Sequence, residues 1–179
     1  MKAKFLSPGE IDAIFSCLSK DRRLVFSVAL ETGLRIGDVL KIRKRDLSQI
    51  APDGVRIAYI AQKTKKRGTT TLQGQTAREV LFLAKFCRGF LWSSHAKCGH
   101  VTRQTAWNWF KEAAKKAKID LDGVSPHALR KSFAVKLRHE KGLEAAKIAL
   151  QHSDNATTAI YAFADVYAGK DSNAPVLWF

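Results

Sequence analysis

Most of the hydrophobic residues recur at the three- and four-residue spacing of amphipathic helices. The Ser-Pro-Gly-Glu sequence at 7–10 is a capping box, which predicts a first helix that runs to about Leu18. A second helix is predicted from Asp21 to Thr32, where Gly33 ends it in the left-handed conformation. Further helices are predicted at 76–87, 102–117, 126–141, 143–150 and 157–164, with a break at Gly142.

One stretch alternates with a period of two instead. After a Pro-Asp-Gly turn at 52–54, apolar and polar residues alternate over Val55–Ile60, which indicates a strand. The basic segment 63–68 follows as a hairpin tip, and residues 69–72 return with β-branched side chains. A small antiparallel sheet is therefore expected among the helices.

Charge points to a polyanionic partner. The formal net charge of +15 comes from 31 Lys and Arg against 16 Asp and Glu, which makes a nucleic acid the natural candidate. The length of 179 residues suits one domain with short appendages. Three cysteines cannot form a complete disulfide framework, and the sequence has neither a spanning apolar run nor a signal-peptide pattern. We therefore expect a cytoplasmic protein that does not bind a membrane.

No metal or cofactor site is expected. His95, Cys98 and His100 cluster, but no second Cys or His pair follows at zinc spacing. The sequence also has neither a Gly-rich phosphate loop nor a carboxylate cluster suited to catalytic metals. Any DNA chemistry here is expected to proceed without a metal pair.

Candidate anion ligands lie at two places in the chain. Arg35 follows the helix stop at Gly33 between two apolar residues, where a half-buried guanidinium suits bidentate anion binding; the alternative is an ion pair with Asp38. His127 and Arg130 are three residues apart on one face of the predicted helix that starts at Pro126. The alternative for them is a solvated surface pair.

Other basic residues are candidates for DNA contacts, with a solvated basic rim as the alternative. They follow Arg35, occupy the hairpin tip or lie on later helices: Lys41, Arg43, Lys44, Arg45, Lys65, Lys66, Arg67, Arg103 and Lys131.

Tyr161 has no structural explanation in the sequence pattern. Tyr59 falls on the apolar alternation of a strand and Tyr167 on an apolar helix stripe, whereas Tyr161 lies about 100° away from that stripe. It also follows His152 by nine residues.

Together these segments resemble the catalytic domain of the tyrosine recombinases, the phage-integrase family. Thr-Gly-Leu-Arg at 32–35 resembles the first arginine box, His-Ala-Leu-Arg at 127–130 the His-x-x-Arg box, and His152 with Tyr161 the closing histidine and tyrosine. Lys63 resembles the lysine of the family's β-hairpin. The resemblance covers residues 7–161 and implies a mainly α (α+β) fold with a small antiparallel sheet.

The resemblance also implies an activity: site-specific cleavage and rejoining of DNA strands through a covalent 3′-phosphotyrosine, without metal or ATP. Arg35, Arg130 and His152 would stabilise the charge on the phosphate, and Tyr161 would be the nucleophile. His127 would accept a proton or bind phosphate. Lys63 would be the general acid, with Lys65 or Lys66 as the alternative if the hairpin register differs.

The family's organisation implies a catalytic domain at 1–164 and a tail at 165–179. The N-terminal core-binding domain that is usual in the family is expected to be absent, which is a departure from its pattern. The expected partner is double-stranded DNA with a specific recombination site, bound as a homotetramer by subunits that can be monomeric when free. The apolar end of the tail, 174–179, would dock on a neighbouring subunit or pack on its own.

Three residues depart from the family pattern: Gly37 in place of a frequent serine, Thr71 in place of proline, and Gln151 in place of glycine. No catalytic group is lost, so an enzyme is favoured over two alternatives. One is a non-cleaving DNA-binding or regulatory relative, or an isolated domain. The other is a type IB topoisomerase, against which the boxes and the short length argue.

Overall fold

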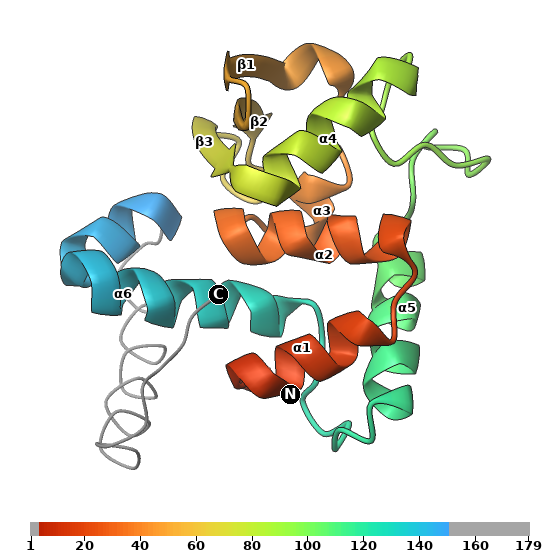
Figure 1. The fold of residues 1–179 in the computed structure, drawn as a ribbon, viewed down its shortest axis with the longest axis vertical. Helices are drawn as coiled ribbons and strands as arrows, with labels where there is room; N and C mark the ends of the chain where they lie inside the picture. Colours follow the sequence, from red (N-terminus) through yellow and green to blue (C-terminus); the bar gives the residue numbers. More distant parts are fainter. Residues whose placement is uncertain (1–3, 151–179) are drawn as a thin grey trace.

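The computed structural model describes residues 4–150, with side chains through residue 142. Figure 1 shows α2 running across the middle of the molecule, with the sheet and α4 on one side and α1 and α6 on the other. The elements in chain order are α1 (Pro8–Ser16), α2 (Lys20–Thr32), α3 (Ile36–Val39), the 3-10 turn η1 (Lys44–Asp46), β1 (Leu47–Ala51), β2 (Gly54–Ile60), β3 (Arg67–Gln73), α4 (Gly74–Phe86), α5 (Arg103–Lys116) and α6 (His127–Leu150).

Local sequence signals set the ends of the first two helices. The Ser7 hydroxyl accepts from the backbone N–H of Glu10 at 3.3 Å, and the Glu10 carboxylate accepts from the Ser7 N–H at 2.8 Å. This confirms the predicted capping box, although the helix ends at Ser16, two residues early. Gly33 ends α2 with φ 65° and ψ 9°, as predicted.

Close packing against Phe133 also leaves no room for a side chain at Gly33. A Cβ at this position would lie 2.2 Å from Cδ1 of Phe133 on α6, so the left-handed turn and close packing require the same glycine. We expect Gly33→Ala to lower the free energy of unfolding by about 2 kcal/mol or more, measured by urea denaturation. Gly9→Ala is the matched control, since a Cβ there meets nothing within 4 Å and alanine favours a helix. Equal stability of the two variants would contradict this explanation.

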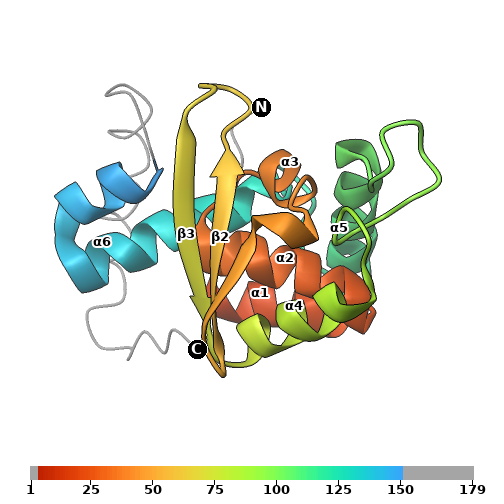
Figure 2. The ribbon, with the colours of Figure 1, turned by 90° about the horizontal axis from the view of Figure 1, so that it is seen from above.

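The sheet is antiparallel with strand order β1-β2-β3. Val55, Ile57 and Leu72 are buried beneath it, where α4 and α2 pack, so the predicted strand and hairpin are confirmed. Figure 2 shows β2 and β3 side by side, running across the helices to the hairpin tip. The first strand, β1, was not predicted. Four of its five residues are exposed, and an edge strand without a buried face shows no alternation of apolar and polar residues.

The later helices α5 and α6 complete the hydrophobic core by packing against α2. Phe26 of α2 and Phe110 of α5 pair with ring centroids 5.0 Å apart, while α6 lies against α2. The predicted break in α6 is confirmed, because Gly142 has φ 82° and ψ 175°. No helix within residues 4–150 has the length and apolar character needed to cross a membrane. The predicted helix at 157–164 lies outside the described residues.

Candidate active site

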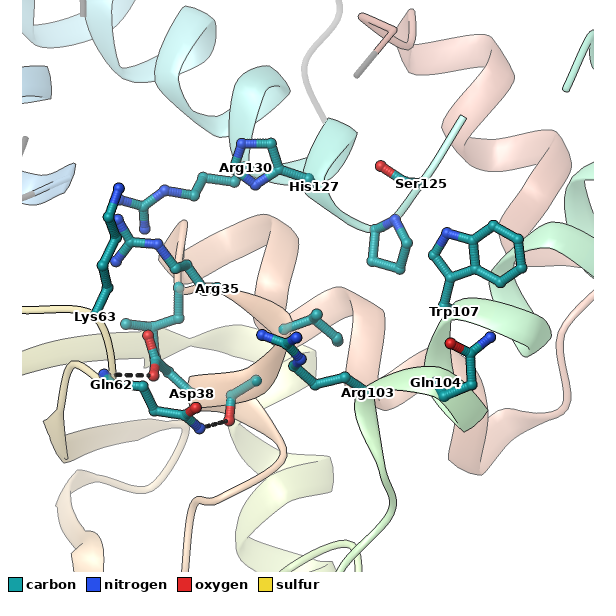
Figure 3. Close-up of a pocket in the computed structure, with 14 residues that line it drawn as sticks. Arg35, Asp38, Gln62, Lys63, Arg103, Gln104, Trp107, Ser125, His127 and Arg130 are labelled. Atoms are coloured by element: carbon teal, nitrogen blue, oxygen red, sulfur yellow. Dashed lines mark hydrogen bonds between the residues drawn. The ribbon is translucent and has the colours of Figure 1, made fainter. Parts of the chain in front are cut away.

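Four segments that are distant in the sequence meet around an open cleft of about 1020 Å³ (Figure 3). They are the turn after α2 with α3, the base of the β2–β3 hairpin, the first turns of α5, and the start of α6. Of the predicted catalytic residues, the cleft brings together Arg35, Lys63, His127 and Arg130. Asp38 is the single acidic side chain among the described residues that line it, so the cleft is strongly cationic.

Arg35 occupies the N-cap position of α3, directly after the turn at Gly33. Its carbonyl accepts from the N–H groups of Asp38 and Val39 at 2.7 and 3.0 Å, which fixes its backbone, and its side chain is half-buried. The alternative of an ion pair with Asp38 is wrong: within the described residues no such pair exists. A carboxylate oxygen of Asp38 instead accepts from the backbone N–H of Gln62 at 3.0 Å.

Arg130 is 5% exposed, so the alternative of a solvated surface residue is wrong for it. Its Nη1 donates to the carbonyl of Gly33, which ties α6 to the turn that precedes Arg35. Burial, and next the positive charge of Arg35, lower the pKa of Arg130 to about 10. The guanidinium therefore stays charged at neutral pH, and an anion that entered the cleft would meet a preorganised charge-assisted donor.

His127 lies at the start of α6, one turn before Arg130. Although its side chain keeps access to solvent, desolvation by the surrounding protein lowers its pKa below the ordinary 6.5, and the charges of Arg130, Lys131 and Arg35 lower it further. The lowered pKa favours the uncharged form of the ring. A neutral imidazole can accept a proton or a hydrogen bond.

Lys63 is the hairpin lysine that reaches the cleft. Its side chain is exposed, and Figure 3 shows it pointing toward Arg35 and Arg130. Lys65 and Lys66 are exposed at the hairpin tip and do not line the cleft. This placement favours Lys63 over both as the lysine that acts at the site.

The candidate DNA contacts fall into three groups. Arg103, at the first position of α5, lines the cleft. The guanidinium of Arg43 lies 4.3 Å from the ring centroid of Phe90, and its backbone N–H donates to a carboxylate oxygen of Asp46 at 2.8 Å, which gives Arg43 a structural role. The remaining candidates lie outside the cleft, exposed or, for the last, half-buried: Lys41, Lys44, Arg45, Lys65, Lys66, Arg67 and Lys131.

The histidine and cysteine cluster is explained by local packing. His100 is buried with its ring 4.8 Å from that of Phe90, and its Nδ1 lies 2.8 Å from the carbonyl oxygen of Val101. The Cys98 thiol donates to the carbonyl of His100 at 3.2 Å. In the part of the chain that the structure describes, no three His, Cys, Asp or Glu side chains could hold a metal ion together.

Several cleft residues had not been singled out from the sequence. Trp107 is 41% exposed because it lies off the buried stripe of α5 that includes Ala106 and Phe110. The position of a large aromatic residue outside the apolar stripe of its helix is the sequence signal that could have identified it. Gln62 and Ser125 carried no comparable signal. His152, Tyr161 and the tail at 165–179 lie outside the described residues.

Most of the chain is similar in sequence to known proteins. The sequence model of the Phage integrase family matches residues 4–166. The tyrosine recombinase XerD of Haemophilus ducreyi is 34% identical over 72% of this chain and 40% of that protein. The tyrosine recombinase XerD of Yersinia pestis is 28% identical over 88% of this chain and 56% of that protein. The chain thus spans about half the length of the curated relatives it matches.

Solved structures share the fold. The XerH site-specific recombinase, in a post-cleavage complex with palindromic difH substrate, aligns with a TM-score of 0.75 at 16% identity, covering 96% of this chain and 53% of that one. A lambda integrase tetramer bound to a Holliday junction aligns with a TM-score of 0.74 at 17% identity, covering 89% of this chain and 48% of that one. The mainly helical fold with a small antiparallel sheet is confirmed.

Proposed function

Since the chain belongs to the phage integrase family, we propose that it carries the catalytic domain of a tyrosine-type site-specific recombinase, which cleaves and rejoins DNA strands. We assign residues 1–164 to that domain. The observation that carries the proposal is the cationic cleft, which Arg35, Lys63, His127 and Arg130 line together and in which Arg130 is anchored to the carbonyl of Gly33.

The proposed chemistry uses these groups without a metal ion or ATP. The Tyr161 phenol attacks the scissile phosphorus as its proton passes to His127, and the bond from phosphorus to the 5′ oxygen breaks. Arg35 and Arg130, with His152, stabilise the negative charge that develops on the non-bridging oxygens. Lys63 protonates the departing 5′ oxygen, which leaves a covalent 3′-phosphotyrosine. Attack by a 5′ hydroxyl then reverses the step and rejoins the strand.

We further propose that the substrate is double-stranded DNA with a specific recombination site, bound by a homotetramer. The net charge of +15 supports a nucleic acid partner, and the DNA complexes of XerH and lambda integrase support this class of assembly. In this assembly the exposed Lys65, Lys66 and Arg67 of the hairpin tip lie against the backbone phosphates, and the tail at 165–179 docks on a neighbouring subunit.

A nicked suicide duplex tests the proposal. Cleavage near a nick releases a short fragment and traps the covalent intermediate, which migrates slowly on a denaturing gel. We expect the wild-type protein to form this adduct on duplexes selected for binding from a random library, and Tyr161→Phe to bind the same duplexes without forming it. Absence of an adduct from the wild type would favour a DNA-binding relative that does not cleave.

The lowered pKa of His127 predicts the pH dependence of cleavage. A proton acceptor must be neutral, so the rate should be constant near pH 7 and fall as the pH drops through a pKa below 6.5. His127→Asn should lower the plateau by about 10²-fold and remove this acidic limb. Single-turnover cleavage between pH 5 and pH 8 measures both effects. A wild-type rate that rises toward pH 5 would show that the protonated ring is the active form.

A further inference from the structure

Gln62 joins the base of the hairpin to the helix that follows Arg35. Its backbone N–H donates to a carboxylate oxygen of Asp38 at 3.0 Å, and its side-chain Nε2 donates to the carbonyl of Gly37 at 2.8 Å (Figure 3). Within residues 4–150, these are the hydrogen bonds that connect residues 61–66 to α3. The residue immediately after Gln62 is Lys63.

Within the part of the chain that the structure describes, the other hydrogen bonds of residues 61–66 lie inside the hairpin tip. The N–H of Ala61 donates to the carbonyl of Lys66 at 2.9 Å, and the N–H of Lys65 donates to the carbonyl of Ala61 at 2.7 Å. These bonds shape the turn and leave its position relative to α3 unset. Because the Lys63 side chain is long and exposed, the place where its ammonium can act depends on how its backbone is held.

Gly37 is the meeting point of three elements. A Cβ at this position would lie 2.8 Å from Cδ of Arg103 on α5 and 3.5 Å from Nε2 of Gln62. The glycine thus lets the Arg103 side chain lie across α3 while the amide of Gln62 reaches the carbonyl beneath it. A serine, which is frequent here in the family pattern, would bring its Cβ into this space.

We propose that the Gln62 side chain is a positioning residue for Lys63, which it holds at the distance from Arg35 that protonation of the leaving 5′ oxygen requires. The inference rests on the proposed function, since it assumes that Lys63 is the general acid. Without the amide, the hairpin base keeps one link to α3, the backbone bond to Asp38, and the hairpin can move relative to the arginines. The defect should then fall on the protonation of the leaving group.

A duplex with sulfur in place of the bridging 5′ oxygen isolates that step. A thiol has a pKa of about 8.5, so a thiolate leaves without a proton, whereas an alkoxide does not. Loss of a general acid therefore slows cleavage of the oxygen duplex and spares the sulfur duplex. Loss of phosphate binding or of folding slows both.

The test compares Gln62→Met with wild type in single-turnover cleavage of the two suicide duplexes. Methionine keeps the length of the side chain and removes the amide donor. We expect the oxygen duplex to be cleaved about tenfold more slowly and the sulfur duplex within about twofold of wild type. Lys63→Ala should show the same pattern with a larger loss. The matched control is Gln49→Met on β1, whose amide also donates to a backbone carbonyl, that of Ala51 at 3.2 Å, outside the cleft; it should leave both rates unchanged.

Two results for Gln62→Met would overturn the inference: cleavage of both duplexes at wild-type rates, or an equal loss on both. Either result leaves the proposed function standing if Lys63→Ala is slow on oxygen and restored on sulfur. If Lys63→Ala is not restored by sulfur, the assignment of the general acid fails, and the role of Gln62 fails with it.

Discussion

Arg130→Lys is expected to lower the rate of DNA strand cleavage by about 10²–10³-fold, while binding of the duplex weakens much less. The reason lies in the two tasks of the guanidinium, which donates to the Gly33 carbonyl from a buried position and also faces the cleft. The ammonium of lysine is a point charge without a rigid fork of donors, so it cannot do both in this geometry. Single-turnover cleavage measures the rate, and a mobility-shift titration measures binding.

Arg138→Lys is the control for this prediction. Arg138 lies two turns further along α6, half-buried and outside the cleft. The cleavage rate of Arg138→Lys should therefore stay within about twofold of wild type. Thermal unfolding of both variants checks that the helix still packs. Because Arg130 acts on the phosphate, sulfur at the bridging position should not restore the rate of Arg130→Lys. Wild-type cleavage by this variant would contradict the role given to the buried arginine.

Lys63→Ala is expected to lower the rate on the oxygen duplex by about 10²–10⁴-fold, the usual range for loss of a general acid. The hairpin offers two matched controls, because Lys65 and Lys66 carry the same charge and are exposed but do not line the cleft. Lys65→Ala and Lys66→Ala should weaken DNA binding in a salt-dependent manner and leave the cleavage rate of bound duplex nearly unchanged. The general acid would be reassigned if one of these variants, and not Lys63→Ala, lost cleavage and regained it with sulfur.

Local signals in the sequence predicted most of the fold. The capping box at Ser7, the left-handed glycine after α2 and the break at Gly142 each follow from one or a few neighbouring residues, and each is confirmed. The strand β1 was not predicted, because the burial that creates a readable pattern is missing at an exposed sheet edge.

In the candidate site, too, some features could be predicted from the sequence and others could not. The motif spacing predicted that Arg35 and Arg130 would bind an anion, and the structure places both in one cleft. The closeness of Asp38 to Arg35 in the sequence left an ion pair between them as the alternative, and no such pair forms among the described residues. The Asp38 carboxylate is instead occupied by Gln62, 24 residues away. Contacts between distant segments depend on how the hairpin packs on α3, and the spacing of residues carries no information about that packing.

Peptide mapping of the trapped adduct identifies the nucleophile of the proposed reaction. The chain has three tyrosines, at 59, 161 and 167, so protease digestion and mass spectrometry of the adduct formed in a chelating buffer can assign the attachment site. We expect a nucleotide linked through its 3′ phosphate to Tyr161, and no adduct from Tyr161→Phe. Attachment at another residue, or an adduct that forms only when a divalent cation is supplied, would contradict it.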